Sequence, residues 1–348
     1  MDAPLTPGTT MRAWAVERPA PISHRPLVEV VRRVPAPGPG EVLVRVRTCG
    51  VCRTDLHLAE GDLAPRHAGI VPGHQVVGEV VARGRRAERF QIGDRVGIAW
   101  LRSTCGQCRW CRSGAENLCP ASSYTGWDAD GGFAEYAVVP AAFAYSLPAG
   151  VDDVSAAPLL CAGIIGYRAL RRAALPPGGR LGIYGFGSSA HLTAQIALAE
   201  GAELYVMTRG TAARALAEEL GAAWVGPADA APPQQLDAAV VFAPAGELVP
   251  VALEALDRGG TLALAGIHMS QVPALDYERH LFYERDLRSV TSNTRADGEE
   301  LLRLAARLRL DVRTTVHPFG QTDTALAAVA AGQVAGSAVV RVSESSRE

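Results

Sequence analysis

The sequence predicts an α/β protein in which a doubly wound parallel sheet is joined to a second, β-rich domain. Two observations predict this architecture. About the first 150 residues contain alternating apolar and polar runs, broken by many Gly and Pro residues, as is typical of strands and turns. From about Ser155 onward, short apolar runs alternate with helix-length segments, as is typical of parallel strands connected by helices. The length of 348 residues also suggests two domains.

The first region begins with strands over residues 27–47, where EVLVRVRT alternates apolar and polar residues behind the turn-rich PAPGPG. Residues 1–10 are expected to be a frayed extension before Met11. Further strands are expected in the runs VVGEVVA, DRVGIAW and FAEYAVV, which are residues 76–82, 94–100 and 133–139.

The second region begins with a helix expected at about 155–172, followed by the turn PPGG. The elements expected next are strands at 180–185, 203–207, 238–243 and 260–267, and helices at 190–202, 212–222 and 248–256. A last strand is expected at 338–342. We therefore expect residues 1–163 and 313–348 to form the β-rich domain, and 164–312 to form the parallel-sheet domain.

Composition excludes several classes of function. All 34 basic residues are arginine, so lysine Schiff bases, pyridoxal attachment and a phosphate-loop lysine are excluded. The net charge of -2 argues against a nucleic-acid partner. Apolar runs such as 262–267 are too short to cross a bilayer, and the N-terminus lacks a signal-peptide pattern. We therefore expect a cytoplasmic protein with no membrane or nucleic-acid partner.

Cysteines form the most specific pattern in the chain. Four of the seven follow the spacing C-x2-C-x2-C-x7-C, at Cys105, Cys108, Cys111 and Cys119. Four thiolates in so short a loop can surround one tetrahedral Zn²⁺ and leave no position for substrate, which indicates a structural site. An iron–sulfur cluster or a pair of disulfides are the alternatives, but clustered cysteines without an export signal favour metal.

The segment GFGSSA carries the dinucleotide fingerprint G-x-G-x-x-A after a predicted strand, with Gly185, Gly187, Ser188 and Ala190 as candidate cofactor contacts. This predicts that the parallel sheet is a Rossmann domain binding a pyrophosphate at a helix N-terminus. The next strand ends in Thr208 and Arg209, where NAD enzymes carry an acidic residue. Because arginine can pair with a 2′-phosphate, NADP(H) is favoured and NAD(H) is the alternative, with Arg209 facing solvent.

The order of CGVCRTDLH, PGHQVVGEV, the four-cysteine loop, PLLCAG and GFGSSA resembles that of the medium-chain zinc-dependent alcohol dehydrogenases. The resemblance covers nearly the whole chain from Met11 and implies a GroES-like fold for the β-rich catalytic domain. It implies that Cys52, His74 and Cys161 bind a catalytic zinc, with water or substrate in the fourth position. Two Zn²⁺ per chain are therefore expected.

The resemblance also implies roles around that zinc. Thr54 and His57 would relay the proton, and Asp55 would orient the histidine ligand. An ordinary helix start with Thr-Asp as caps is the alternative, and the relay is favoured in this context. Further residues expected from the resemblance are the cofactor contacts Arg53, Gly266 and Asn293 and the substrate-pocket residues Trp100, Leu101 and Trp127.

Two residues depart from the family pattern: Gln75 replaces the usual Glu after the histidine ligand, and Ile165 replaces a frequent Thr. Cys49 is left over, and Cys49-x-x-Cys52 could be a redox pair, although no thioredoxin-like context surrounds it. The expected function is hydride transfer between a small alcohol or aldehyde and the cofactor by a homodimer or homotetramer. A zinc polyol dehydrogenase and a catalytically silent cofactor-binding relative are the alternatives.

Overall fold

The computed structural model describes residues 8–334 and 336–343, which divide into two compact units. Unit 1 contains the chain up to Cys161, Thr294–Leu302 and the segment from Thr314 onward, and unit 2 contains Ala162–Asn293 and Arg303–Arg313. Of the expected N-terminal extension, residues 1–7 lie outside the described residues. Thr10, which the expected extension included, already belongs to the first strand.

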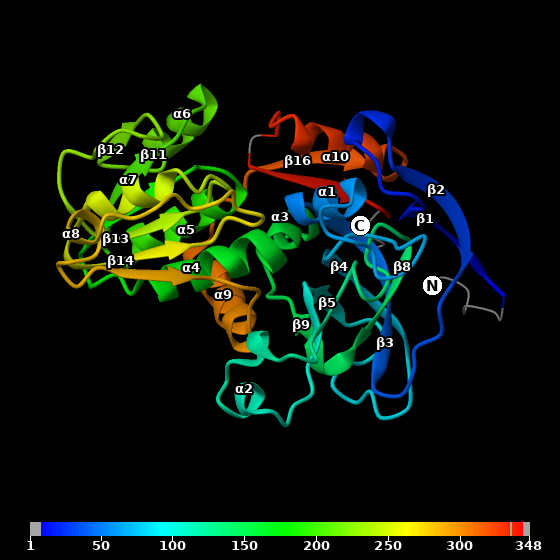
Figure 1. Ribbon diagram of the computed structural model, residues 1–348. Coiled ribbons are helices and arrows are strands. Elements are labelled where there is room, and N and C mark those ends of the chain that lie inside the picture. The colour runs from blue at the N-terminus through cyan, green and yellow to red at the C-terminus, as the bar shows by residue number, and fades with distance from the viewer. Residues whose placement is uncertain (1–7, 335, 344–348) are drawn as a thin grey trace. The chain divides into compact units, whose positions relative to one another are not determined.

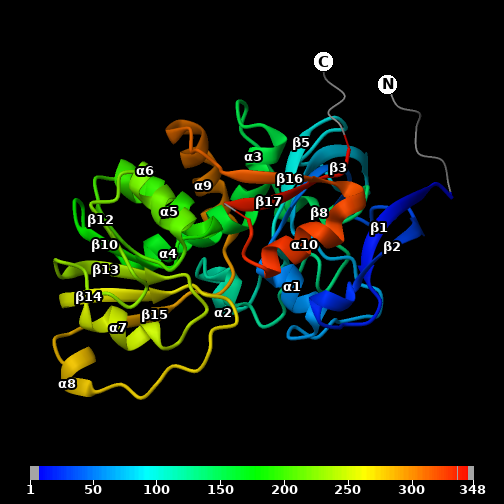
Figure 2. The same ribbon diagram turned by 90° about the horizontal axis from the view of Figure 1, so that it is seen from above.

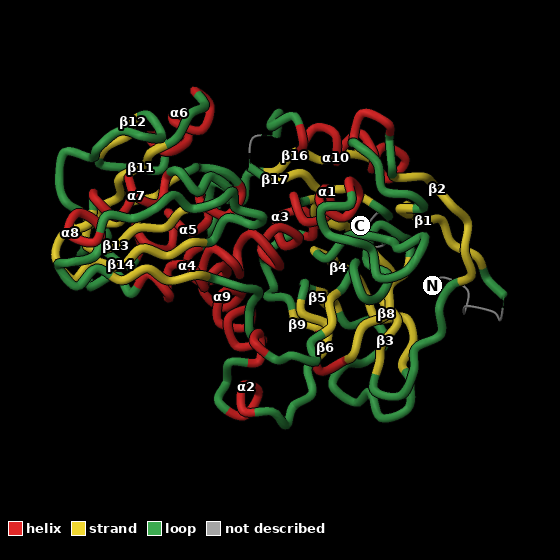
Figure 3. Tube along the Cα trace, viewed as in Figure 1, coloured by secondary structure: helices red, strands yellow, loops and turns green. Residues whose placement is uncertain are grey.

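The regular elements of unit 1 are mainly strands, drawn yellow in Figure 3, joined by long loops. Within the described residues its largest sheet has the order β16-β17-β3-β4-β5-β9, with β8 also pairing with β3. These strands are β3 (Glu41–Val51), β4 (Gln75–Arg83), β5 (Arg95–Ile98), β8 (Tyr136–Pro140), β9 (Ala144–Ser146), β16 (Thr314–Pro318) and β17 (Ser337–Arg341). Two small antiparallel pairs accompany it: β1 (Thr10–Val16) with β2 (Leu27–Arg33), and β6 (Leu101–Ser103) with β7 (Ser123–Tyr124).

The core of unit 1 forms because the alternating residues of β3 and β4 are apolar. Val42, Val44 and Val46 of β3 and Val76 and Val80 of β4 are fully buried. The helices of this unit are α1 (Arg53–Glu60), α2 (Arg109–Arg112), α3 (Asp153–Pro158) and α10 (Thr322–Ala330). Helix α9 (Arg295–Leu308) begins in unit 1 and ends in unit 2.

Unit 2 contains a parallel sheet with the order β12-β11-β10-β13-β14-β15. Its strands are β10 (Arg180–Tyr184), β11 (Glu203–Met207), β12 (Trp224–Gly226), β13 (Leu236–Val241), β14 (Leu256–Leu264) and β15 (Asp286–Ser289). Numbered along the chain from β10, this is the 3-2-1-4-5-6 order of a dinucleotide-binding sheet. The order reverses between β10 and β13, so a ligand is expected beyond the carboxyl ends of these two strands.

Helices cover both faces of this sheet, as Figures 1 and 2 show. They are α4 (Ile164–Ala173), α5 (Ser188–Ala199), α6 (Thr211–Glu219), α7 (Leu248–Glu254) and α8 (Tyr277–His280). Figure 2 places α4 and α5 along one face and α7 and α8 along the other. The predicted fold class, a doubly wound parallel sheet with a β-rich GroES-like domain, is confirmed.

The helix predicted at 155–172 is wound in three parts, because a π-helical turn over Leu159–Gly163 separates α3 from α4. By length and apolar composition alone, the continuous segment Asp153–Ala173 could cross a membrane, which the sequence analysis did not anticipate. Its most apolar window is 67% buried within the protein, as in the core helix of a globular fold.

Candidate active site

Cys52, His74 and Cys161 come together in unit 1, although they are far apart in the sequence. The Nε2 atom of His74 lies 3.3 Å from the Cys52 sulfur and 3.3 Å from the Cys161 sulfur. A tetrahedral zinc with its ordinary sulfur and nitrogen bond lengths would hold such atoms about 3.6 Å apart. The three donors therefore fit a zinc ion that has one position left for another ligand.

Local structure places each of these donors. Cys52 is the N-cap of α1, where its sulfur accepts the Thr54 N–H at 3.3 Å. His74 stands directly before β4 and is only 1% exposed. Cys161 lies in the π-helical turn, a distortion that is frequent at functional sites.

Asp55 connects the first two donors. One of its carboxylate oxygens accepts the Cys52 N–H at 2.9 Å and completes a capping box. The other accepts the Gly73 N–H at 3.0 Å and lies 3.3 Å from Nδ1 of His74. Asp55 thus completes the capping box of α1 and also faces the ring nitrogen that a metal-binding Nε2 leaves free.

The charges in this site favour a bound cation. The hydrogen bond from Cys161 lowers the pKa of Cys52 well below its usual range despite burial. Burial lowers the pKa of His74, but the charges of Cys52 and Asp55 outweigh that effect and raise it to about 10. A proton on His74 balances part of this negative charge, and a zinc ion at Nε2 would replace that proton as the compensating cation.

Cys49 does not belong to this ligand group. It is fully buried in β3, and a side chain at Gly73 would come within 2.9 Å of its sulfur. Burial raises the pKa of Cys49 well above its usual range, which opposes a reactive thiolate. Gln75, the neighbour of His74, is 2% exposed and packs against Gly50. These two residues therefore form part of the packing under the site.

His57 and Thr54 lie on α1 next to Cys52. The Thr54 side chain is buried, and Nδ1 of His57 lies 2.9 Å from the Asp62 carboxylate. Asp62 is a partner that the sequence did not reveal, because it falls in the loop after α1. The neighbouring Arg53 is exposed.

Aromatic rings gather beside His74. Trp100 contacts the His74 ring edge-on at 5.0 Å and stacks on Trp127 at 6.0 Å. Tyr124 stacks on both tryptophans, at 4.9 and 5.7 Å, and was missed because only its place in the fold brings it there. Leu101 is 1% exposed and pairs with Tyr124 between β6 and β7, so it lies next to this aromatic cluster (Trp100, Tyr124 and Trp127) in the sheet.

The four-cysteine loop brings its sulfur atoms together as closely as a zinc site requires. Three pairs are 3.5, 3.6 and 4.0 Å apart, close to the ~3.8 Å edge of a zinc–thiolate tetrahedron and far from the ~2.05 Å of a disulfide. Backbone N–H donors of Gln107 and Cys108 lower the pKa of Cys105 to about 6, which favours the thiolate. The loop around α2 (Figure 1) thus fits a second, closed zinc site made of Cys105, Cys108, Cys111 and Cys119.

Apart from Arg53, which lies on α1 in unit 1, the predicted cofactor contacts lie in unit 2, at or just beyond the carboxyl ends of parallel strands. Gly185 follows β10 with φ +85°, and a side chain there would meet the Ala243 backbone at 2.9 Å. Gly187 caps α5 and has open space around it, while Ala190 is fully buried. An anion could therefore approach the N-terminus of α5, as a dinucleotide pyrophosphate does.

Other predicted contacts follow neighbouring strands. Thr208 and Arg209 come after β11, Gly266 after β14, and Asn293 after β15. Ser188 is the first residue of α5. Arg214, which the sequence analysis missed, donates from Nε to the Thr208 carbonyl at 3.0 Å. Two arginines therefore accompany the end of β11.

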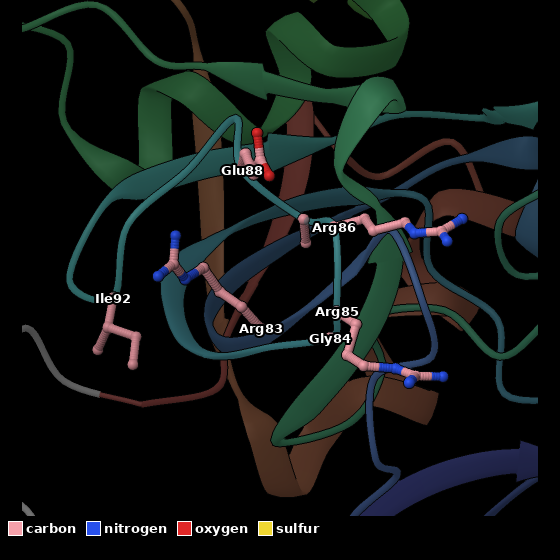
Figure 4. Close-up of a pocket in the computed structure, with 7 residues that line it drawn as sticks. Arg83, Gly84, Arg85, Arg86, Glu88 and Ile92 are labelled. Atoms are coloured by element: carbon pink, nitrogen blue, oxygen red, sulfur yellow. The ribbon is translucent and has the colours of Figure 1, made fainter.

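One pocket lies away from these sites, along the basic segment from Arg83 to Ile92. In Figure 4 the Arg83 side chain extends to the opposite side from those of Arg85 and Arg86, so the three guanidinium groups do not meet. They therefore form no common anion site.

A Rossmann sheet together with an open Cys-His-Cys set and a closed four-cysteine set defines a zinc-binding dehydrogenase. Family models agree: "Alcohol dehydrogenase GroES-like domain" matches residues 38–149, and "Zinc-binding dehydrogenase" matches residues 190–307. The chain belongs to the medium-chain zinc-dependent alcohol dehydrogenase family, as the resemblance indicated.

Individual relatives agree with this assignment. The chain is 58% identical over 347 residues to "Probable alcohol dehydrogenase AdhA" of Mycobacterium tuberculosis, covering 98% of this chain and 100% of the relative. It is 34% identical to an alcohol dehydrogenase of Geobacillus stearothermophilus, covering 87% and 92% of the two chains. The cobalt- and zinc-bound thermostable alcohol dehydrogenase of Pyrobaculum aerophilum superimposes with a TM-score of 0.87 at 27% identity, covering 96% and 100%.

Proposed function

We propose that this enzyme interconverts small apolar alcohols with their aldehydes or ketones, using NADP(H) and two zinc ions per chain. The observation that carries the proposal is the buried Cys52–His74–Cys161 set, which has three donors and room for a fourth ligand. A closed structural site would fill all four positions, whereas a catalytic zinc keeps one for substrate. The relatives named alcohol dehydrogenases, described above, support the reaction class.

Zinc bound there would act as a Lewis acid on the substrate oxygen, and the nicotinamide would take or give the hydride. The protein holds the ligands and the proton path. Asp55 would keep the His74 ring oriented, because its carboxylate lies at Nδ1. Thr54, buried beside Cys52, would take the substrate proton, and His57 would pass it toward solvent with Asp62 as its partner.

The aromatic cluster supports an apolar substrate. Trp100 contacts His74 edge-on, and Tyr124 and Trp127 stack on Trp100. Aromatic surfaces of this kind gain most from excluding water. A polyol would need several polar partners for its hydroxyl groups. The cluster therefore favours a simple alcohol over the polyol alternative.

One experiment tests the reaction class and its metal dependence. Zinc content is measured on purified protein, and aldehyde reduction is followed before and after treatment with a chelator. Two zinc ions per chain, with activity lost on chelation and restored by added zinc, are expected. Full activity in zinc-free protein would overturn the proposal.

The end of β11 supports the choice of NADP(H). Arg209 is exposed, and Arg214 is anchored at the same strand end by its bond to the Thr208 carbonyl. Thr208 stands where an acidic side chain would repel a 2′-phosphate. A charge-assisted pair with arginine gives about 1–3 kcal/mol, which corresponds to a preference of about fivefold to a hundredfold for NADPH.

The cofactor proposal is tested by the double variant Thr208→Asp with Arg209→Ala. The ratio of kcat/KM for NADPH to that for NADH is expected to fall at least tenfold, because a repelling carboxylate replaces an attracting guanidinium. Arg18→Ala, at another exposed arginine, is the matched control and should leave the ratio unchanged. An unmodified enzyme that prefers NADH would show that Arg209 faces solvent.

We further propose that the enzyme forms a homodimer or homotetramer. Strand β15 is an edge of the described sheet, and the exposed Phe282, Tyr283 and Leu287 lie on or beside it. An exposed sheet edge with large apolar side chains favours pairing with a second copy. Light scattering at micromolar concentration tests this, and a monomer there would refute it.

A further inference from the structure

Helix α5 contains a histidine that the predicted reaction does not use. His191 is fully buried in unit 2, next to Leu192 and Ala194, which are also fully buried. Its Nδ1 atom lies 3.3 Å from the carbonyl oxygen of Gly187, the N-cap of the helix. Its Nε2 atom has no hydrogen-bond partner among the described residues. Burying an imidazole with one unpaired nitrogen costs free energy, so a histidine at this position indicates a specific role for its side chain.

This geometry assigns the tautomer of the ring. A hydrogen on Nδ1 is donated to the Gly187 carbonyl and leaves only a bare lone pair on Nε2. The other tautomer would set two lone pairs against each other at 3.3 Å and bury an unpaired N–H group. His191 is therefore a neutral donor to Gly187, consistent with burial lowering its pKa.

The Gly187 carbonyl matters because of the peptide plane to which it belongs. In a trans peptide the C=O and the following N–H point in opposite directions. The Gly187 oxygen accepts the backbone N–H of His191 at 3.1 Å and the imidazole as a second donor, so it is held toward the helix body and the Ser188 N–H is aimed outward from the N-terminus of α5. Gly187 itself has open space around it, so an anion can reach that N–H.

A second side chain makes the same kind of hydrogen bond two residues further along the helix. The Thr193 hydroxyl donates to the Ser189 carbonyl at 2.8 Å, again four residues back, and Thr193 is fully buried. By the same geometry, this bond aims the Ala190 N–H outward. Gly166 of α4 packs against Thr193, since a side chain at Gly166 would come within 2.3 Å of its hydroxyl oxygen. The rotamer of Thr193 is thus fixed by packing.

We propose that His191 and Thr193 are positioning residues for the cofactor. They act from inside helix α5 to hold the peptides of the glycine fingerprint with their N–H groups toward the cofactor pyrophosphate. Their effect falls on the two phosphates that NAD(H) and NADP(H) share, so it does not depend on which of the two cofactors the enzyme prefers. Preorganised donors bind an anion more tightly because they need no reorientation when it arrives.

The experiment compares His191→Leu and His191→Asn by titration calorimetry with ADP-ribose. Leucine keeps the volume and removes the donor, whereas the asparagine amide can replace Nδ1–H. Loss of one such hydrogen bond should weaken ADP-ribose binding about three- to tenfold in the leucine variant. The asparagine variant keeps that hydrogen bond, so its affinity for ADP-ribose should stay within about twofold of that of the unmodified protein. Thr193→Val lacks the hydroxyl and should also weaken ADP-ribose binding. Thr193→Ser keeps the hydroxyl and should bind ADP-ribose like the unmodified protein.

Two further measurements separate positioning from a merely structural role. Adenosine lacks the phosphates, so its affinity should be the same in all variants. The leucine variant removes the unpartnered Nε2, so it should melt no lower than the unmodified protein while binding ADP-ribose more weakly. Leu192→Ala is the matched control, because it should lower the melting temperature and leave ADP-ribose affinity intact.

Equal ADP-ribose affinity in the unmodified protein and His191→Leu would overturn the proposal. So would a parallel loss of adenosine and ADP-ribose affinity, because that result would indicate general damage to the fold. Unmodified protein that binds no ADP-ribose would overturn both this proposal and the dinucleotide site. The preference for NADPH over NADH is measured in the separate experiment on Thr208 and Arg209, and it does not change how the ADP-ribose affinities are interpreted.

Discussion

The two cysteine-containing sites of unit 1 are built in opposite ways. The four-cysteine loop draws all its donors from 15 consecutive residues, Cys105–Cys119, and Cys105 is exposed. The other site draws its donors from a helix cap, a strand start and a π-helical turn, and His74 is almost fully buried. The first site can organise only its own loop, whereas the second needs the whole unit to be folded before it exists. Loss of metal should therefore affect stability at the first site and turnover at the second.

The largest expected effect follows removal of a buried donor. His74→Ala should lower kcat/KM by at least about a thousandfold, because the Lewis acid contributes several kcal/mol to the transition state. The fold should persist, since the site forms only after unit 1 has folded. Zinc content should fall from two ions to one per chain, with an unchanged circular dichroism spectrum. If the His74→Ala enzyme stays active, the buried site does not hold the catalytic zinc, and the contrast between a catalytic and a structural site is wrong.

Removal of a donor from the loop should act mainly on stability. In Cys108→Ser the closed site loses a ligand, and metal binding at such sites contributes directly to folding free energy. The loss should reach about 4 kcal/mol and lower the melting temperature by about 10 °C. Turnover per folded molecule at low temperature should change much less than in His74→Ala. A Cys108→Ser protein that melts normally would show that the loop is not a metal site.

A smaller effect is expected at Asp55, which touches only the buried site. Asp55→Asn keeps the shape of the side chain and removes the charge that faces Nδ1 of His74. Loss of such a partner typically costs about 10- to 100-fold in metal affinity or activity. The zinc dissociation constant of the buried site should rise while the loop zinc stays bound. If zinc affinity is unchanged, Asp55 serves only to complete the capping box of α1.

The same contrast explains what could be predicted from the sequence. The spacing of the four cysteines predicts a local site, and alternation of apolar residues predicts strands such as β4 and β10. Donors brought together by the fold, like Cys161, could be named only through the family resemblance. Tyr124 and Asp62 escaped notice because nothing in their local sequence indicates a distant partner. Strand β15 and helix α9 were also missed, since β15 is short and largely exposed and α9 follows a segment without regular alternation.

The smallest expected effect concerns a second attachment of the four-cysteine loop. Glu116, between Cys111 and Cys119, is 7% exposed and accepts hydrogen bonds from the backbone and guanidinium of Arg295, the first residue of α9. Burial alone would raise the pKa of Glu116, but the hydrogen bonds and charge of Arg295 outweigh it and lower that pKa. A depressed carboxyl pKa in the folded state stabilises the protein above the unfolded-state pKa, and this stability is lost as the pH falls through the folded-state pKa.

Glu116→Gln should therefore destabilise the protein by about 1 kcal/mol near pH 7, or roughly 2–4 °C in melting temperature, because the pair is partly screened by solvent. The difference between the two proteins should shrink as the pH falls below about 4.5, the ordinary glutamate range, and vanish once Glu116 is protonated in both states. Thermal melts at several pH values measure this, with Glu299→Gln as a control at an exposed glutamate of α9 that pairs with Arg89. A deficit that stays constant across this pH range would show that the Glu116 charge does not hold the loop, and that the sulfur site alone secures it.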